Sequence, residues 1–178
     1  MKILILTFYF NPDLCAGSFR SSAFINALKP LLQNNDSVDV VTTMPNRYKS
    51  FRREAKSLEK DGNINIIRVQ LPPHRSGFLD QSRAFLTYLI QTLSYTRNKD
   101  YDMVFATSSR LFTAFLGALI ARIKGVTVYL DIRDIFTDTM KSLLPLPISL
   151  VVLPMFLLIE RFTISTADKI NLVSEGFS

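Results

Sequence analysis

Short, continuous apolar runs alternate along this chain with longer segments in which apolar residues recur at helical spacing. Continuous apolar runs are typical of strands covered on both faces, and their alternation with helices indicates βαβ units around a parallel sheet. The fold class that follows is α/β, with a Rossmann-like, doubly wound, mostly parallel sheet. We expect six strands, at residues 3–6, 38–41, 64–69, 103–105, 126–130 and 170–173.

Helical spacing of apolar residues predicts the segments between these strands. The first helix is marked by Phe24, Ala27, Leu28 and Leu31, and Pro30 should kink or shorten it. Gly125 is placed to end a later helix as a C-cap residue. With no linker in the pattern, we expect one domain over residues 1–178. The helices are expected around residues 24–31, 86–98, 112–123 and 156–166.

The chain is basic, with a net charge of +6 and a pI of about 9.6. This positive charge predicts an acidic partner. Nucleic acid, a phosphorylated ligand and an anionic membrane face are the three candidates. Few aromatic residues lie outside the expected core helices, which disfavours nucleic acid. An apolar fraction of 48% excludes a disordered chain. Many basic residues fall in one polar stretch, which is either a binding surface or a solvated one: Arg47, Lys49, Arg52, Arg53, Lys56 and Lys60.

Two loops in the first part of the chain are candidate ligand sites, because ligands of open α/β sheets bind at the carboxyl ends of the strands. Gly17 precedes a helix and would let an anionic group approach the helix N-terminus, with Arg20 in the first turn. A tight strand-to-helix turn is the alternative explanation for Gly17. After the second strand, residues 42–46 end in Asn46, and a long polar excursion follows.

Two further loops follow the fourth and fifth strands. Ser108 could cap the next helix, or help its exposed amides hold a phosphate. Residues 131–138 form the densest polar cluster at a strand end, where Asp131 and Asp134 flank Arg133. One carboxylate could stay ionised through pairing while the other acts as a base, or all three could form a structural ion-pair network.

No metal site is expected. The Asp131 to Asp134 spacing is not an Asp-x-Asp pattern, and further ligands are missing. His74 is the only histidine and is expected on a surface loop. Cys15 cannot form an intramolecular disulfide, because it is the only cysteine, and nothing supports it as a nucleophile.

Two segments have membrane character. Residues 143–159 carry no charge, but the run is short and contains prolines, so we expect a buried or interfacial segment rather than a span. The helix around residues 86–98 adds an aromatic stripe, Phe78, Phe85, Tyr88 and Tyr95, near several arginines. That stripe suits either an interfacial membrane site or a helix packed on two sides.

Five segments, in order, resemble the amino-terminal domain of glycosyltransferase family 4, particularly bacterial enzymes that build O-antigen and related polysaccharides. The first runs from Phe10-Asn11-Pro12 through Gly17 to Arg20. The fourth, Asp131-Ile132-Arg133-Asp134, is similar to the Asp-x-Arg-Asp of that family. The resemblance spans essentially the whole chain. The other three segments are residues 43–46, 106–112 and 160–174.

The resemblance implies the acceptor-side half of a two-domain GT-B enzyme, with the donor-binding domain outside this sequence and this half inactive alone. It implies a retaining, metal-independent transfer from a nucleotide diphosphate sugar, expected to be a UDP-sugar, to a saccharide on polyprenyl diphosphate. Asp134 would be catalytic, Asp131 and Arg133 would orient it, and the remaining site residues would contact acceptor or donor: Gly17, Arg20, Asn46 and Ser108.

Such an enzyme would serve O-antigen and lipopolysaccharide synthesis at the inner face of the cytoplasmic membrane. The alternative is a non-enzymatic, basic Rossmann-like module that docks on anionic membranes. Its binding would weaken steeply with salt and would show no selectivity among sugars.

Overall fold

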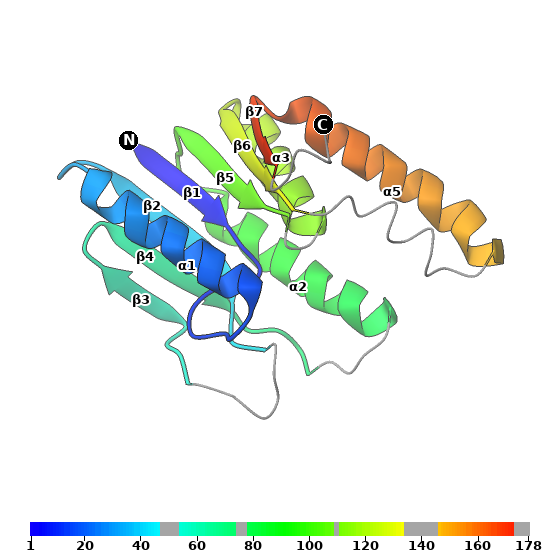
Figure 1. Cartoon of the computed structure of the whole chain (residues 1–178), viewed down its shortest axis with the longest axis horizontal. Coiled ribbons are helices and arrows are strands. Elements are labelled where there is room, and N and C mark those ends of the chain that lie inside the picture. The colour runs from blue at the N-terminus through cyan, green and yellow to red at the C-terminus, as the bar shows by residue number, and fades with distance from the viewer. Residues whose placement is uncertain (47–53, 74–77, 109–110, 134–145, 173–178) are drawn as a thin grey trace. The chain divides into compact units, whose positions relative to one another are not determined.

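The computed structural model describes residues 1–46, 54–73, 78–108, 111–133 and 146–172 (Figure 1). The chain divides into two compact units, residues 1–102 and 103–178, and each is described by itself.

The first unit contains four strands in the order β3-β4-β2-β1. The pairs β1 with β2 and β2 with β4 are parallel, with Ile3 opposite Val38 and Val40 opposite Ile66. The side chains of β1 and β2 are nearly all buried, as the continuous apolar runs predict. The strands are β1 (Lys2–Leu6), β2 (Ser37–Thr43), β3 (Leu58–Asp61) and β4 (Ile64–Val69).

Strand β3 is the one strand of this unit that the sequence analysis missed. It pairs antiparallel with β4 at the edge of the order, and all four of its residues are exposed. A charged, exposed edge strand has no apolar alternation to reveal it, and charges on an edge discourage pairing with other chains. The expected turn at residues 61–63 is confirmed, with Gly62 at φ 60° between the two strands.

Helix α1 (Ala16–Leu28) is followed by the 3-10 turn η1 (Lys29–Leu31). Pro30 therefore shortens the helix, as predicted. The apolar residues that mark the helix do not form its buried side, since Phe24 and Leu31 are exposed. Its buried residues are Ser18, Ser21 and Ile25.

Helix α2 (Phe78–Thr96) turns its tyrosines toward the sheet of its own unit. Tyr88 is fully buried, and its hydroxyl donates to the Val41 carbonyl oxygen at 2.8 Å. Tyr95 donates to the Asp39 carboxylate. For these two tyrosines the structure supports the packed-helix interpretation rather than a membrane-facing stripe.

The second unit contains strands in the order β5-β6-β7, paired in parallel. The expected C-cap is confirmed: Gly125 has φ 66°, and Val126 N donates to the Ala121 carbonyl. Helices α3 and α5 pack through two ring contacts, Phe112 with Phe156 and Phe115 with Phe162. The elements are β5 (Met103–Thr107), α3 (Leu111–Lys124), β6 (Thr127–Ile132), α5 (Leu146–Thr166) and β7 (Lys169–Leu172).

The predicted fold class, a Rossmann-like α/β fold, is confirmed in the described residues. Strands alternate with helices, and each of the strand pairings given above is parallel except that of β3 with β4. Within the described ranges, none of the helices combines the length and apolar character needed to cross a membrane.

Candidate functional site

The chain leaving β1 is held to the end of β2 by buried threonines. Thr43 Oγ1 donates to the Phe8 carbonyl oxygen at 2.7 Å. Thr7 Oγ1 lies 2.9 Å from the Tyr9 carbonyl oxygen and 2.8 Å from Ser21 Oγ on α1. These bonds fix the loop between β1 and α1 at the carboxyl edge of the sheet, where parallel α/β proteins bind ligands.

Asp13 and Asn46 join the loops that follow β1 and β2. The Asn46 backbone N–H donates to Asp13 Oδ1 at 3.1 Å, and Asn46 Nδ2 donates to Thr43 Oγ1 at 2.7 Å and to the Met44 carbonyl at 2.9 Å. Asp13 itself is buried. Asn46 is a predicted site residue. Its backbone N–H and its side-chain amide are both used in hydrogen bonds that hold these loops in place.

Arg68, on β4, connects the same loop to β3. Its side chain is only 4% exposed. Nη1 donates to Glu59 Oε2 at 2.8 Å and to the Lys56 carbonyl at 2.9 Å, while Nη2 donates to the Asn11 carbonyl at 2.9 Å. We call Asp13, Thr43, Asn46 and Arg68 the first-unit polar cluster.

Of this cluster, Asn46 was predicted as a site residue, and Thr43 lay in the candidate loop of residues 42–46, whereas Asp13 and Arg68 were not predicted. Arg68 lies inside a mostly apolar strand, and this feature could have identified it, because a charged side chain that is buried must find partners. No comparable sequence feature indicated the contacts of Asp13 and Thr43, because a polar residue is unremarkable in a loop or at the end of a strand.

Gly17 and Arg20 lie at the start of α1. Cys15, the N-cap residue, makes no side-chain cap, and the first turn has no acidic residue. The buried Ser18 hydroxyl has no hydrogen-bond partner, whereas the Gly17 carbonyl accepts from Ser21 Oγ at 2.9 Å. Arg20 is exposed. A helix start without a carboxylate is electrostatically suited to an anion.

A second group gathers at the carboxyl ends of β5, β6 and β7. In register, Asp131 lies opposite Thr107 on one side and Asn171 on the other. Asn171 Nδ2 donates to Asp131 Oδ1 at 2.7 Å, and Arg133 Nε donates to Oδ2 at 3.3 Å. The Ser108 N–H donates to the Asp131 carbonyl at 2.9 Å. We call Ser108, Asp131, Arg133 and Asn171 the second-unit polar cluster.

Within this cluster, the Ser108 hydroxyl contacts the chain that follows β6. Its Oγ accepts from the Arg133 backbone N–H at 2.8 Å, which holds the chain as it leaves β6. Asp131 is buried with both carboxylate oxygens engaged, so it suits an orienting role rather than proton transfer. Arg133 Nη2 is buried without a hydrogen-bond partner, so one donor of the guanidinium remains for a ligand.

Several predicted positions fall outside the described residues. Asp134, the expected catalytic residue, is one of them, and His74 is another. Most of the basic stretch, residues 47–53, is another. Among the residues that the structure does describe, no group of three or more His, Cys, Asp or Glu side chains could hold a metal ion.

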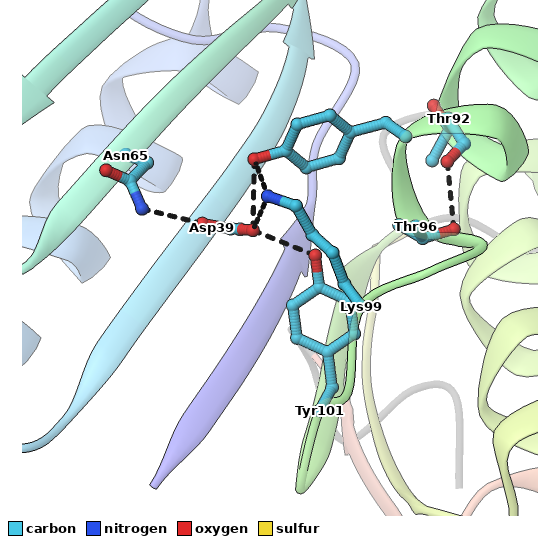
Figure 2. Close-up of polar contacts among 7 residues, drawn as sticks. Asp39, Asn65, Thr92, Thr96, Lys99 and Tyr101 are labelled. Atoms are coloured by element: carbon cyan, nitrogen blue, oxygen red, sulfur yellow. Dashed lines mark hydrogen bonds and ion pairs between the residues drawn. The ribbon is translucent and has the colours of Figure 1, made fainter.

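A third polar cluster lies nearer the amino end of β2, away from the carboxyl edge (Figure 2). Asp39 Oδ2 accepts from Tyr95 at 3.0 Å, and from Lys99 and Tyr101 at 2.8 Å each, while Asn65 donates to Oδ1 at 2.8 Å. Lys99 also contacts the Tyr95 hydroxyl. The cluster fastens the segment after α2 to the sheet.

Ionisation in this cluster follows from its hydrogen bonds. Burial raises the pKa of Asp39, but hydrogen bonds from Lys99, Asn65 and Tyr101 outweigh it, so the net pKa lies below the usual range. For Lys99, burial lowers the pKa, yet the hydrogen bonds with Asp39 and Tyr95 raise it overall. Burial, followed by the Asp39 charge, raises the pKa of Tyr101. The cluster is thus a stable ion pair flanked by neutral phenols, with a structural role.

No family model matches the chain. No curated protein matches it either. Among solved structures, the chain is similar to a UGT transferase from Siraitia grosvenorii in complex with UDP, with 16% sequence identity and a TM-score of 0.42. The alignment covers 75% of this chain and 28% of that transferase, so the chain spans well under two thirds of its length.

Proposed function

We propose that the chain is the amino-terminal, acceptor-binding half of a retaining glycosyltransferase. The enzyme would move a sugar from a nucleotide diphosphate sugar, a UDP-sugar, to a saccharide on polyprenyl diphosphate in O-antigen or related surface polysaccharide synthesis. One observation carries the proposal: both units hold a buried polar cluster at the carboxyl ends of their parallel strands. In α/β proteins this edge is the ligand-binding edge.

In the first unit, the proposed contact is an anionic group of the acceptor or donor. The start of α1 has no carboxylate and no side-chain cap, and the Ser18 hydroxyl is unpartnered. Gly17 keeps the helix start free of a bulky side chain, and Arg20 adds a positive charge close by. Diphosphate oxygens are the ligands that this combination suits.

In the second unit, Asp131 and Ser108 orient Arg133 and the residue that follows it. The backbone of Arg133 is fixed by Ser108 Oγ, and its guanidinium is fixed by Asp131. The free Nη2 donor suits a sugar or phosphate oxygen. Asp134 comes next in the chain, and we assign it the polar or general-base role at the acceptor.

The net charge of +6 also fits an acceptor with a diphosphate group at a membrane surface. A peripheral place at the inner face of the cytoplasmic membrane is part of the proposal. The transfer itself needs no metal in this proposal, because the cationic side chains and the helix start supply the positive charge.

A binding titration of this chain tests the proposal. A soluble diphosphate-linked sugar acceptor analogue and several nucleotide sugars are titrated at low and moderate salt. We expect selective binding of the acceptor analogue that persists at moderate salt, with weak or absent nucleotide-sugar binding. Equal binding of all anions, lost equally as salt rises, would refute the proposal and leave only an electrostatic surface.

Variants locate the binding in the second-unit polar cluster. Arg133→Gln should weaken acceptor-analogue binding by about tenfold to a hundredfold, because a charge-assisted hydrogen bond contributes roughly 1.5–3 kcal/mol. Arg122→Gln is the matched control, since Arg122 is an exposed cation in the last turn of α3. An equal loss in both variants would indicate a general charge effect.

A further inference from the structure

We infer that Asn171 is a positioning residue, which keeps the Nη2 donor of Arg133 available to a ligand by holding the Asp131 carboxylate away from it. The inference rests on the proposed function, in which Arg133 donates to a sugar or phosphate oxygen, and it adds the residue that controls this donor. Asn171 lies on β7 and was not among the predicted site residues.

The ion pair between Arg133 and Asp131 uses one donor where the guanidinium offers two. Arginine frequently meets a carboxylate through two parallel N–H groups, and Nε and Nη2 lie on the same edge of the guanidinium. Here Nε donates to Asp131 Oδ2 at 3.3 Å, whereas Nη2 is buried and has no hydrogen-bond partner. Another contact must therefore keep the carboxylate from closing on both donors.

Asn171 makes that contact. It lies opposite Asp131 in the register of β6 and β7, and its Nδ2 donates to Asp131 Oδ1 at 2.7 Å. The Asp131 side chain is 4% exposed, so little water can take the place of Asn171. A rotation that brought Oδ1 to Arg133 Nη2 would break this bond. Asn171 thus sets the orientation of the carboxylate.

The backbone on both sides of the ion pair is also held. The Ser108 N–H donates to the Asp131 carbonyl at 2.9 Å, and Ser108 Oγ accepts from the Arg133 N–H at 2.8 Å. Closure of the pair therefore depends on the side chains. With Asn171 in place, Arg133 is oriented through Nε and offers Nη2 to a ligand oxygen. Without Asn171, the Asp131 carboxylate would occupy both donors.

The first unit contains the same type of bond in a structural setting. Asn65 lies opposite Asp39 in the register of β4 and β2, and its Nδ2 donates to Asp39 Oδ1 at 2.8 Å (Figure 2). Asn171→Leu is the test variant, because leucine is similar in size to asparagine and cannot donate. Asn65→Leu is the matched control, because it removes an equivalent bond outside the second-unit polar cluster.

Nitrogen-15 NMR of the guanidinium groups tests the inference on the full chain without any ligand. The signals of Arg133 are assigned by their absence in Arg133→Gln. In Asn171→Leu, a two-donor pair should slow rotation of the guanidinium, so the Arg133 Nη protons should become separately resolved. Asn65→Leu should leave these signals unchanged. Amide spectra of the same samples show whether each variant is folded.

Binding of the soluble diphosphate-linked acceptor analogue measures the consequence for the site. Asn171→Leu should weaken binding by about tenfold or more, because Asp131 takes the Nη2 donor. Asn171→Gln keeps an amide donor and should recover most of the affinity. In the Arg133→Gln background, Asn171→Leu should cause no further loss, because it acts through Arg133. Asn65→Leu should bind like the wild type.

Unchanged Arg133 signals in Asn171→Leu would overturn the inference. An equal change of these signals in Asn65→Leu, or additive losses of binding in the double variant, would also overturn it. If the wild-type chain does not bind the analogue, the proposed function fails, while the guanidinium spectra still decide whether Asn171 controls Arg133.

Discussion

Two buried charged residues, Asp39 and Arg68, each form hydrogen bonds with several partners. Asp39 accepts from four donors, and Arg68 donates to two carbonyls and a carboxylate. Burying a charge costs free energy unless hydrogen bonds compensate, so removing one member leaves the others unsatisfied. Single substitutions at these residues should therefore cost more than exposed ion pairs do.

Asp39→Asn should lower the free energy of unfolding by about 2 kcal/mol at pH 7, because charge-assisted hydrogen bonds to the carboxylate are lost. The pKa of Asp39 is depressed in the folded chain, so its contribution is present above the unfolded pKa of about 3.9 and is lost as pH falls through the folded pKa. Urea unfolding of both proteins between pH 7 and pH 2.5 measures the difference, which should shrink in acid.

Asp61→Asn is the control, because Asp61 pairs with Lys29 at the surface, where both side chains are about half exposed. Its effect at pH 7 should stay below about 1 kcal/mol. If the Asp39→Asn difference persisted unchanged to pH 2.5, ionisation of Asp39 would not be its source.

Arg68→Met should destabilise the first unit by about 2 kcal/mol, since the Asn11 and Lys56 carbonyls and the half-exposed Glu59 carboxylate would lose their buried donor. Because Nη2 holds the Asn11 carbonyl, amide hydrogens of residues 8–15 should also exchange faster. Denaturant unfolding and hydrogen exchange by mass spectrometry measure the two effects. Lys60→Gln, an exposed cation on β3, should change neither; a similar effect in both variants would contradict the assignment.

At the scale of elements, apolar runs identified six strands, including the largely exposed β7, while the charged edge strand β3 escaped detection. Six strands were predicted within about two residues of their bounds, but β3 was missed because its residues are charged or exposed. In α1 the apolar spacing found the helix, whereas serines form most of its buried side. Periodicity detects a helix from its apolar residues, but it cannot say which side the neighbouring strands cover.

Helix α3 packs so closely against β5 at Gly117 that a larger residue there would clash with the strand. A Cβ added there would lie 2.5 Å from Ala106 Cβ, which is attached directly to the β5 backbone and cannot rotate away. Gly117→Ala should therefore lower the free energy of unfolding by about 1–3 kcal/mol, although alanine is the better helix former. Thermal unfolding measures this effect. Ser94→Ala on the exposed side of α2 should stay within about 0.5 kcal/mol, and a stabilised Gly117→Ala would contradict the close contact.

At the scale of the whole molecule, the two polar clusters differ in how many of their residues could be predicted from the sequence as candidate site residues. Asp131, Arg133 and Ser108 are close in sequence to strand ends, so the strand pattern and the rule of carboxyl ends were enough to select them. Asp13 and Arg68 reach the carboxyl edge of their own unit only through contacts across 33 and 57 residues of chain, to Asn46 and Asn11. These partners come together because of the order of the strands in the sheet. That order cannot be derived from a single sequence.

Each unit should exchange its amide hydrogens in a defined order. Strand β2 lies between β1 and β4, and β6 lies between β5 and β7, so these two strands have ladder partners on both sides within their units. Native-state hydrogen exchange should give β2 and β6 the slowest amides of their units, and β3 the fastest among the strands. Protection of β3 equal to that of β2 would mean that its edge is covered in solution.

The serine-rich contact side of α1 has a mechanical consequence. Most helices resist sliding because a shift exposes packed hydrocarbon, but on α1 only Ile25 is both apolar and buried. The Ser21 hydroxyl can exchange one oxygen partner for another at little cost, and the Ser18 hydroxyl has no hydrogen bond to lose. α1 is therefore the helix of the first unit that can be displaced most cheaply, and its start is the end that borders the proposed ligand. Arrival of a diphosphate there could be converted into a translation of the whole helix.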